Sequence, residues 1–158
     1  MKHDETGSIA TIEAEAQGWH HRLMPSPADA ELISRATAVL NPRRLSPTVE
    51  VGGVGSALRT SSGAIHLGVC IDAASGIGFC AEHAAIASMI TSGESRIESI
   101  MAVNWDGGIL SPCGRCRELI YQVDPGNAET RVLLPNDRVT TVRALLPDHW
   151  LLDGPSKS

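Results

Sequence analysis

Three cysteines in two short motifs constrain this chain more than any other feature. Cys80-Ala81-Glu82 has the pattern C-x-E, and Pro112-Cys113-Gly114-Arg115-Cys116 has the pattern P-C-x-x-C. Zinc takes thiolate ligands in a tetrahedral arrangement, and catalytic zinc sites use three protein ligands and leave the fourth position to water. Cys80, Cys113 and Cys116 therefore predict a catalytic zinc site.

Glu82 is the acidic residue of the first motif. The pattern resembles that of the zinc nucleobase deaminases, in which this glutamate is not a zinc ligand, so we expect Glu82 to lie beside the metal without binding it. Bound zinc lowers the pKa of water to about 7, and a nearby carboxylate would carry protons between that water and the leaving group. Cys113 and Cys116 are three positions apart, so at the start of a helix they face the same way. Cys80 and Glu82 converge only if Cys80 stands at the very start of its helix, where N–H groups also stabilise a thiolate.

Three thiolates on a divalent ion give such a site a net negative charge. Arg115, Arg117 and His83 are near enough in sequence to offset it. The alternative is a closed structural zinc site, or buried cysteines beside a solvated glutamate. A structural site needs a fourth nitrogen or sulfur ligand, for which His83 and Cys70 are the candidates. The combination of both motifs favours the catalytic interpretation.

The composition is that of one domain with an aliphatic core. The 158 residues are 42% hydrophobic but only 3% aromatic, and this length buries a core without disulfides. The net charge of −5 argues against a nucleic-acid polymer as partner, because such binding relies on Lys and Arg to neutralise phosphates. There is no apolar run of membrane-spanning length and no signal-peptide pattern, and the metal motifs use three of the four cysteines. We therefore expect a cytoplasmic protein without disulfides that binds no membrane.

The domain is expected over residues 26–154. It follows an N-terminal segment with little apolar pattern, residues 1–25, and precedes a polar tail, residues 155–158. His20 and His21 are adjacent, so they point to different sides of a strand or helix. We interpret them as a solvated or locally packed pair and not as metal ligands.

The apolar pattern predicts helices that alternate with strands. The expected elements are a helix over Pro27–Leu40, a linker containing Pro42 and Pro47, a β-hairpin of Val49–Arg59 and Ala64–Ile71, a helix from about Cys80 to Thr91, a strand over Ile97–Asn104, a loop over residues 105–108, a helix over Gly114–Val123, a strand over Arg131–Leu134 and a short helix near Thr141–Leu146. Ser26 is the N-cap of the first helix, and Pro27 suits its first position. Gly52, Gly53 and Gly55 inside a strand indicate a bulge, or the close approach of a ligand or a neighbouring subunit. Strands joined through helices predict a three-layer α/β/α domain.

The chain resembles the cytidine deaminase superfamily, in the branch with three cysteine ligands, and within it blasticidin S deaminase. Besides the zinc motifs, the similar segments are Gly108–Arg117, Leu32–Ala38, Leu145–Pro147 and Asp153-Gly154. The resemblance implies an α/β fold with a five-stranded mixed sheet, a homotetramer with sites near subunit contacts, and zinc-dependent hydrolytic deamination. By motif it makes Cys80, Cys113 and Cys116 the zinc ligands and Glu82 the proton shuttle.

The chain departs from its relatives where the substrate binds. Cytidine-specific relatives carry Asn-x-Glu on the second strand, which binds the nucleoside sugar, and a Phe on the first strand, which stacks on the base. Aligned through shared glycines, these positions are Cys70, Asp72 and Gly52, and a thiol cannot replace the paired hydrogen bonds of an amide. The C-terminal aromatic pair of the blasticidin enzyme is matched only by Trp150, with Leu152 at its second position. The predicted substrate-binding residues are therefore Cys70, Asp72 and Trp150.

We expect a zinc hydrolase that converts the exocyclic amine of a cytosine-type nucleoside or related aminoheterocycle to a carbonyl and releases ammonia. The substrate is expected to be a small molecule: a cytidine-like nucleoside is the leading candidate, blasticidin S the alternative, and a modified free base third. A nucleic-acid-editing deaminase usually has His as first ligand and a basic binding face, and this chain has neither. The non-enzymatic alternative is a deaminase fold used as a zinc-binding module. Glu82 argues against it, because a scaffold needs no unligated carboxylate there.

Overall fold

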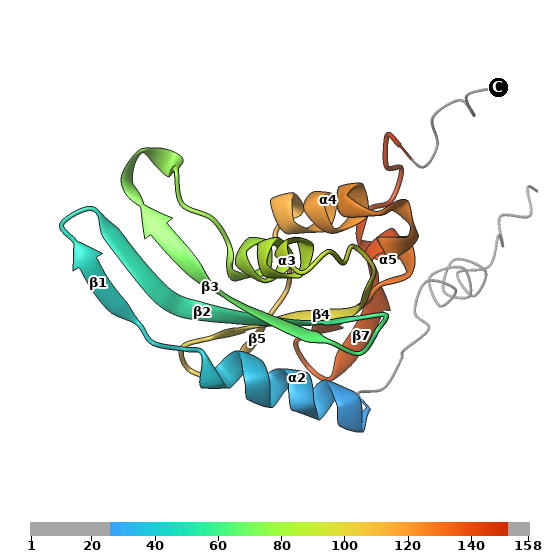
Figure 1. The fold of residues 1–158 in the computed structure, drawn as a ribbon, viewed down its shortest axis with the longest axis horizontal. Helices are drawn as coiled ribbons and strands as arrows, with labels where there is room; N and C mark the ends of the chain where they lie inside the picture. The colour runs from blue at the N-terminus through green and yellow to red at the C-terminus, as the bar shows by residue number, and fades with distance from the viewer. Residues whose placement is uncertain (1–25, 152–158) are drawn as a thin grey trace, which may run out of the picture.

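The computed structural model describes residues 26–151, in which a mixed sheet lies between two helical layers (Figure 1). In chain order its elements are α2 (Pro27–Ala38), β1 (Arg43–Ser46), β2 (Val49–Thr60), β3 (Ile65–Ala73), the 3₁₀ turn η2 (Ala74–Gly76), α3 (Ala81–Thr91), β4 (Ile97–Asn104), β5 (Ile109–Leu110), α4 (Gly114–Val123), the 3₁₀ turn η3 (Pro125–Glu129), β6 (Arg131–Leu134), β7 (Arg138–Thr141) and α5 (Val142–Leu145). The predictions for His20, His21 and the polar tail concern residues outside the described range. None of the described helices has the length and apolar character needed to cross a bilayer.

Within residues 26–151, seven strands form one sheet around β2 and β4. β2 pairs antiparallel with β3 and β4, β6 lies parallel to β4, and β7 pairs antiparallel with β6 at the edge. Two short strands complete the sheet, because β1 pairs with the beginning of β2 and β5 with the end of β4. The prediction of a mixed sheet is confirmed, but the expected number of five strands was wrong.

The strands that the sequence analysis missed are short and lack a clear apolar alternation. β1 contains two exposed arginines and lies between Pro42 and Pro47, where we expected a linker. β5 has two residues, and β7 forms by pairing with β6 across a turn at Asn136 and Asp137. Such pairings depend on a neighbouring strand, which a local sequence pattern does not encode. The first helix ends at Ala38, two residues before the predicted end.

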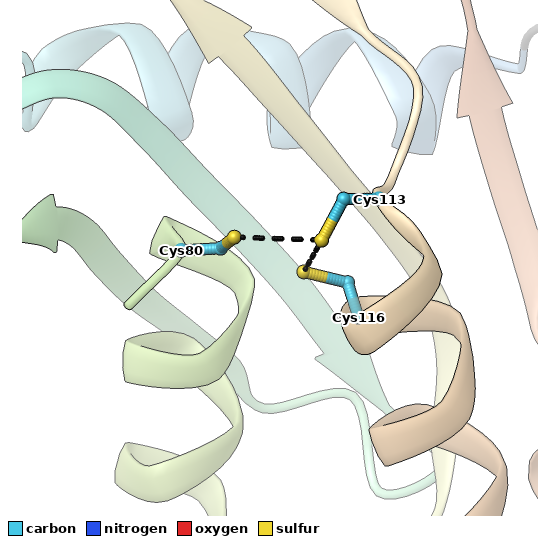
Figure 2. Close-up of side chains that lie close together, drawn as sticks. All are labelled: Cys80, Cys113 and Cys116. Atoms are coloured by element: carbon cyan, nitrogen blue, oxygen red, sulfur yellow. Dashed lines mark hydrogen bonds between the residues drawn. The ribbon is translucent and has the colours of Figure 1, made fainter. Parts of the chain in front are cut away.

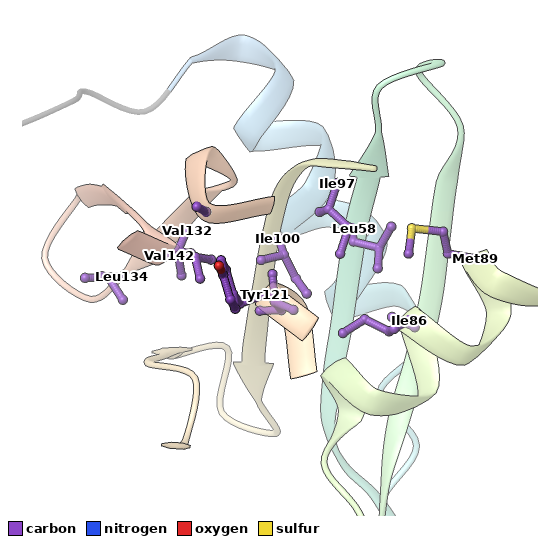
Figure 3. Close-up of a cluster of buried hydrophobic side chains, with 12 residues drawn as sticks. Leu58, Ile86, Met89, Ile97, Ile100, Tyr121, Val132, Leu134 and Val142 are labelled. Carbon is purple, nitrogen blue, oxygen red and sulfur yellow. The ribbon is translucent and has the colours of Figure 1, made fainter. Parts of the chain in front are cut away.

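Helix α2 covers one face of the sheet, and α3, α4 and α5 cover the other (Figure 1). Successive residues of a strand point to opposite faces, so Ala57 packs with Leu32 of α2. Leu58 and Ile100 pack with Ile86 of α3 in a larger cluster on the other face (Figure 3). The three-layer α/β/α architecture is therefore confirmed, with a buried cluster on each side of the sheet.

The glycines of β2 accompany a bulge and two close main-chain contacts. The pairing of β2 with β3 shifts register between Val51 and Gly55. Gly52 has φ = 75°, and a Cβ there would lie 2.3 Å from the carbonyl oxygen of Asn41. A Cβ at Gly55 would lie 2.4 Å from the carbonyl oxygen of Ala36. The bulge is therefore the better interpretation of these glycines, and the close neighbour is the chain itself.

A buried ion pair fastens α2 to β6. The carboxylate of Asp29 is fully buried, and the Arg131 guanidinium donates to it twice, at 3.1 and 2.8 Å. Asp29 also completes a capping box with Ser26. We expect Arg131→Met to lower the free energy of unfolding by about 3 kcal/mol, because it leaves a buried carboxylate without its cation. Urea denaturation measures this change.

An exposed pair provides the control for that variant. Arg143 and Glu129 form an ion pair at 2.8 Å with both side chains more than half exposed, so Arg143→Met should cost less than about 1 kcal/mol. Burial raises the pKa of Asp29, but the hydrogen bonds from Arg131 and Ser26 outweigh it and hold the pKa below its ordinary value of 3.8. The loss of unfolding free energy caused by Arg131→Met should therefore have its full size above about pH 4 and become smaller below it. Equal losses in the two variants would contradict this account.

Candidate active site

Two helix N-termini bring three cysteine sulfurs together (Figure 2). The Sγ atom of Cys113 lies 3.6 Å from that of Cys80 and 3.5 Å from that of Cys116. Cys80 is the N-cap residue of α3 and Cys113 that of α4, and both have extended backbones. Cys116 lies in the first turn of α4. The prediction that Cys80 stands at the very start of its helix is confirmed.

Close packing of α3 on the sheet sets the position of Cys80. Gly68 of β3 faces the beginning of α3, where an added Cβ would lie 2.3 Å from the nitrogen of Ala85 and 2.5 Å from the oxygen of Ala81. Ala81 and Ala85 are fully buried at this contact. The small residues therefore let the helix lie directly on the strand that carries Cys70.

The sulfur cluster fits zinc. Three thiolates at about 2.3 Å from a tetrahedral metal lie about 3.8 Å apart, close to the sulfur–sulfur distances of 3.5 and 3.6 Å. Within residues 26–151 the cluster has no fourth ligand atom from a His, Cys, Asp or Glu. His83 and Cys70, the candidates for a closed structural site, are not part of it. The donor set therefore matches an open zinc site with three protein ligands.

The electrostatics of the cluster also favour a divalent cation. Burial raises the pKa of the Cys116 thiol, and the Glu82 carboxylate raises it further. Burial and the neighbouring Cys113 likewise raise the pKa of Cys80. Burial opposes ionisation of Cys113 too, but the N–H groups of Cys116 and Arg115 and the adjacent thiols hold its pKa below the ordinary value. A bound cation would stabilise all three thiolates together.

A cavity of about 490 Å³ opens beside the cysteines. Cys80, Cys113 and Glu82 line it, and the Glu82 side chain is 6% exposed. Glu82 lies outside the cluster of metal-ligating atoms, although its charge acts on Cys80 and Cys116. The cavity therefore joins a metal site to a carboxylate that is free for acid–base chemistry.

Comparisons with known proteins agree with this geometry. The chain is 32% identical over 101 residues to cytidine deaminase of Mycobacterium tuberculosis, a match that covers 63% of this chain and 74% of that enzyme. This chain belongs to the cytidine deaminase family. It is also 36% identical over 106 residues to blasticidin-S deaminase of Bacillus cereus, with 60% and 74% covered.

Solved structures support the same assignment. The crystal structure of cytidine deaminase from Mycobacterium leprae matches with a TM-score of 0.64 and 31% identity, over 75% of this chain and 96% of that chain. No family model matches the sequence. As a member of the cytidine deaminase family, the protein is a zinc-dependent hydrolase that acts on the C–N bond of a cyclic amidine. The predicted fold class, reaction and cofactor are thereby confirmed.

Two of the three predicted substrate-binding residues line the cavity of this deaminase. Cys70 is buried, and Asp72, two positions further along β3, is exposed at the cavity wall. The Cys70 Sγ accepts a hydrogen bond from the N–H of Val54 at 3.2 Å and donates one to the Asp72 carboxylate at 3.5 Å. The thiol is therefore engaged by its own neighbours.

The third predicted residue, Trp150, does not line this cavity. It is 67% exposed, and its Nε1 donates to Glu118 on α4 at 3.1 Å. The neighbouring His149 is buried and lies 2.7 Å from the same carboxylate. Gly52, the position of the stacking ring in relatives, is not a cavity residue either, and Val54 stands at the wall instead. Both residues lie in the stretch of β2 where its pairing with β3 shifts register, between Val51 and Gly55.

The basic residues near the cysteines play different parts. Arg115 lines the cavity, and its part in lowering the pKa of Cys113 is played by its backbone N–H, which adds to the larger effects of the Cys116 N–H and the adjacent thiols. Arg117 donates to the carbonyl oxygen of Pro112 at 2.9 Å and so holds the loop before Cys113. The Nε2 atom of His83 is buried without a hydrogen-bond partner among the described residues. The predicted offset of thiolate charge by the side chains of Arg115 and His83 stays a prediction.

Several cavity residues escaped the sequence analysis. Phe79, Leu110 and Ser111 directly precede the cysteine motifs, and Ala102 comes from β4. The signal for the first three was their place next to predicted metal ligands. Ala102 carries no such signal, because only the pairing of β4 with β2 and β5 brings it to the cavity.

Proposed function

We propose that Cys80, Cys113 and Cys116 bind the zinc ion of this hydrolytic deaminase and that Glu82 is its proton shuttle. The observation that carries the proposal is the cavity in which the sulfur cluster and a free, nearly buried carboxylate meet. Zinc, when bound, lowers the pKa of water and supplies hydroxide at neutral pH. The Glu82 carboxylate takes one proton from this water and gives it to the ring nitrogen of the substrate. It then takes the second proton from the hydroxyl formed on the ring carbon and gives it to the departing amine, so that the carbonyl forms as ammonia leaves.

The overall reaction replaces one C–N bond by a carbonyl. One water is consumed and one ammonia is released for each exocyclic amine converted. The buried Glu82 and the apolar side chains of Val54, Ala102 and Leu110 give the ring a mainly apolar setting, in which the electrostatic interactions of the carboxylate are stronger than in water. A zinc-binding module without activity would not need this buried acid.

The proposed substrate is a cytosine-type nucleoside, with Cys70 and Asp72 facing the part of the substrate beyond the ring. Support comes from the relatives, which are named cytidine deaminase and blasticidin-S deaminase, and from the place of both residues at the cavity wall. Cytidine is the leading candidate and blasticidin S the second. Trp150 stays a predicted contact, which would need a different arrangement of the C-terminal segment.

An ammonia-release assay tests this function. The zinc-loaded protein is incubated separately with cytidine, deoxycytidine, cytosine and blasticidin S, and ammonia and the carbonyl product are quantified together. We expect equal amounts of both from at least one nucleoside. No ammonia from any of the four compounds would contradict the proposal.

The thiol of Cys70 should weaken the enzyme's preference for cytidine over the free base cytosine. A site that hydrogen-bonds a hydroxyl rejects analogues that lack it by about 10⁴-fold in well-studied enzymes, and a thiol already engaged by Val54 and Asp72 offers little to a ribose. We expect Cys70→Asn to raise kcat/KM for cytidine relative to cytosine by about tenfold or more. Cys70→Ser, a matched small substitution, should change the ratio less. A wild type that prefers cytidine over cytosine by about a thousandfold would overturn this prediction.

The homotetramer also belongs to this proposal, as an inference from the family resemblance. Ile77, Phe79 and Leu110 are exposed apolar side chains on or next to the segments that line the cavity, as expected where a second subunit packs near the site. Light scattering after size-exclusion chromatography measures the mass directly. The cytoplasmic location stays a prediction from the sequence.

A further inference from the structure

A second cavity of about 310 Å³ lies on the strands next to the proposed active site. Asp72 lines both cavities, and Gly53 of the second cavity is followed directly by Val54 of the first. The other charged residues of the second cavity are Arg43, Arg44 and Glu50. The cavity beside the sulfur cluster therefore adjoins the second cavity, whose lining is mainly charged.

The sheet register aligns these charged residues. Arg44 of β1 is the partner of Glu50 of β2, and Glu50 is in turn the partner of Asp72 of β3. Cys70 is two positions before Asp72 on the same strand, and so lies on the same face. In Figure 1, β1, the beginning of β2 and the end of β3 form an arm that extends past the helices. The charged row runs across this arm and ends at the proposed active site.

These four charges are not paired with one another. The Arg43 guanidinium donates to the carbonyl oxygen of Asn41 at 3.1 Å, and that of Arg44 donates to Ser46 and Pro47 carbonyl oxygens at 3.0 and 2.6 Å. Within the described part of the chain, no ion pair involves Arg43, Arg44, Glu50 or Asp72. Opposite charges on neighbouring strands normally attract each other. Here the two cations and two anions are not neutralised by ion pairs, although both arginines donate to backbone carbonyls and Asp72 accepts from Cys70.

We propose that the second cavity binds a zwitterionic, amino-acid-like substituent of the substrate, with its carboxylate at Arg43 and Arg44 and its ammonium group at Glu50 and Asp72. The proposal rests on the proposed function, because the substrate's amine-bearing ring must lie beside Glu82. A neutral sugar would leave all four charges unmatched. A phosphate would meet the arginines but would also face two carboxylates. A zwitterion matches both signs, and charge-assisted hydrogen bonds are the stronger ones in proteins.

Four cytosine nucleosides test this inference. The probes are cytidine and three 5′-thioethers of 5′-deoxycytidine: the homocysteine conjugate, which is zwitterionic, its analogue without the carboxylate, and its analogue without the amine. We expect kcat/KM for the zwitterion to exceed that for cytidine by about tenfold or more, the gain of one good charged contact. The two singly charged analogues should lie between them. Equal values for the zwitterion and cytidine would overturn the inference.

Variants assign the contacts. In Arg44→Ala, and in Arg43→Ala as a second variant, the advantage of the zwitterion over its carboxylate-free analogue should disappear. Glu50→Gln should remove the advantage over the amine-free analogue. Arg138→Ala changes an exposed arginine on β7 and should leave both ratios unchanged. An advantage of the zwitterion over its carboxylate-free analogue that persists in an Arg43→Ala/Arg44→Ala double variant would contradict the assignment.

The outcomes separate this inference from the proposed function. If cytidine is deaminated without any preference for the zwitterion, the second cavity is not a substrate subsite and the proposed function stands. If no probe releases ammonia, the proposed function fails and the inference fails with it.

Discussion

Replacing Glu82 with glutamine should leave zinc bound and lower turnover by about 10⁴-fold, because the substitution keeps the shape of the side chain and removes its ability to carry a proton. Glu82 lines the cavity and is nearly buried, so no solvent carboxylate can replace it. It is not part of the sulfur cluster, so the metal does not depend on it. Elemental analysis and steady-state kinetics on the same preparation measure both quantities.

Glu98→Gln is the matched control for this variant. Glu98 is an exposed residue of β4 away from the cavity, and its substitution should change neither zinc content nor kcat. If Glu82→Gln kept substantial activity, the proton shuttle would be another residue, and His83 would be the nearest one. If Glu82→Gln lost zinc, the carboxylate would be a ligand and the assignment of three cysteines would be incomplete.

Cys113→Ala and Cys116→Ala should each lose zinc and much of the stability of the fold. Metal binding and folding are coupled where ligands from separate elements meet at one ion, and these ligands join α4 to Cys80 at the start of α3. Cys116 is fully buried, so its loss also removes packing. We expect less than about one tenth of the wild-type zinc and a clearly lower midpoint of thermal unfolding.

Cys70→Ala separates the loss of a ligand from the loss of a buried cysteine. Cys70 is buried and lines the same cavity, but it is not one of the clustered sulfurs. This variant should keep one zinc per chain. Full zinc occupancy in Cys113→Ala or Cys116→Ala would contradict the ligand assignment.

Part of the proposed metal site was predictable because its geometry is local. Cys113 and Cys116 share the first turn of one helix, and Cys80 begins another, so spacing fits each motif to a metal. The resemblance to the zinc deaminases joined the two motifs into one site. The α2 cap was predictable for the same reason, since Ser26 and Pro27 are adjacent. The partner of Asp29, by contrast, is Arg131, 102 positions away. No local pattern relates these two residues.

The substrate side was less predictable because it depends on strand pairing. Gly52, the expected position of the stacking ring, lies in the bulge of β2 and does not line the cavity, whereas Val54 does. The segment that contains Arg43 and Arg44 was predicted to be a linker because it lies between two prolines. In the structure it forms β1 by pairing with β2. Trp150 is an aromatic residue in the expected part of the chain, yet it contacts Glu118 and does not line the cavity. Chemistry at the metal is thus encoded locally, and specificity is encoded by tertiary contacts.

Deamination in water labelled with ¹⁸O tests the central claim most directly. The zinc-loaded protein is incubated with each of the four cytosine compounds of the ammonia assay in labelled water, and the product is analysed by mass spectrometry. If Glu82 and the zinc ion deliver water to the amine-bearing carbon, each product molecule carries one ¹⁸O in its new carbonyl group, with one ammonia released. An unlabelled product, or no product from any of the compounds, would contradict hydrolytic deamination at this site.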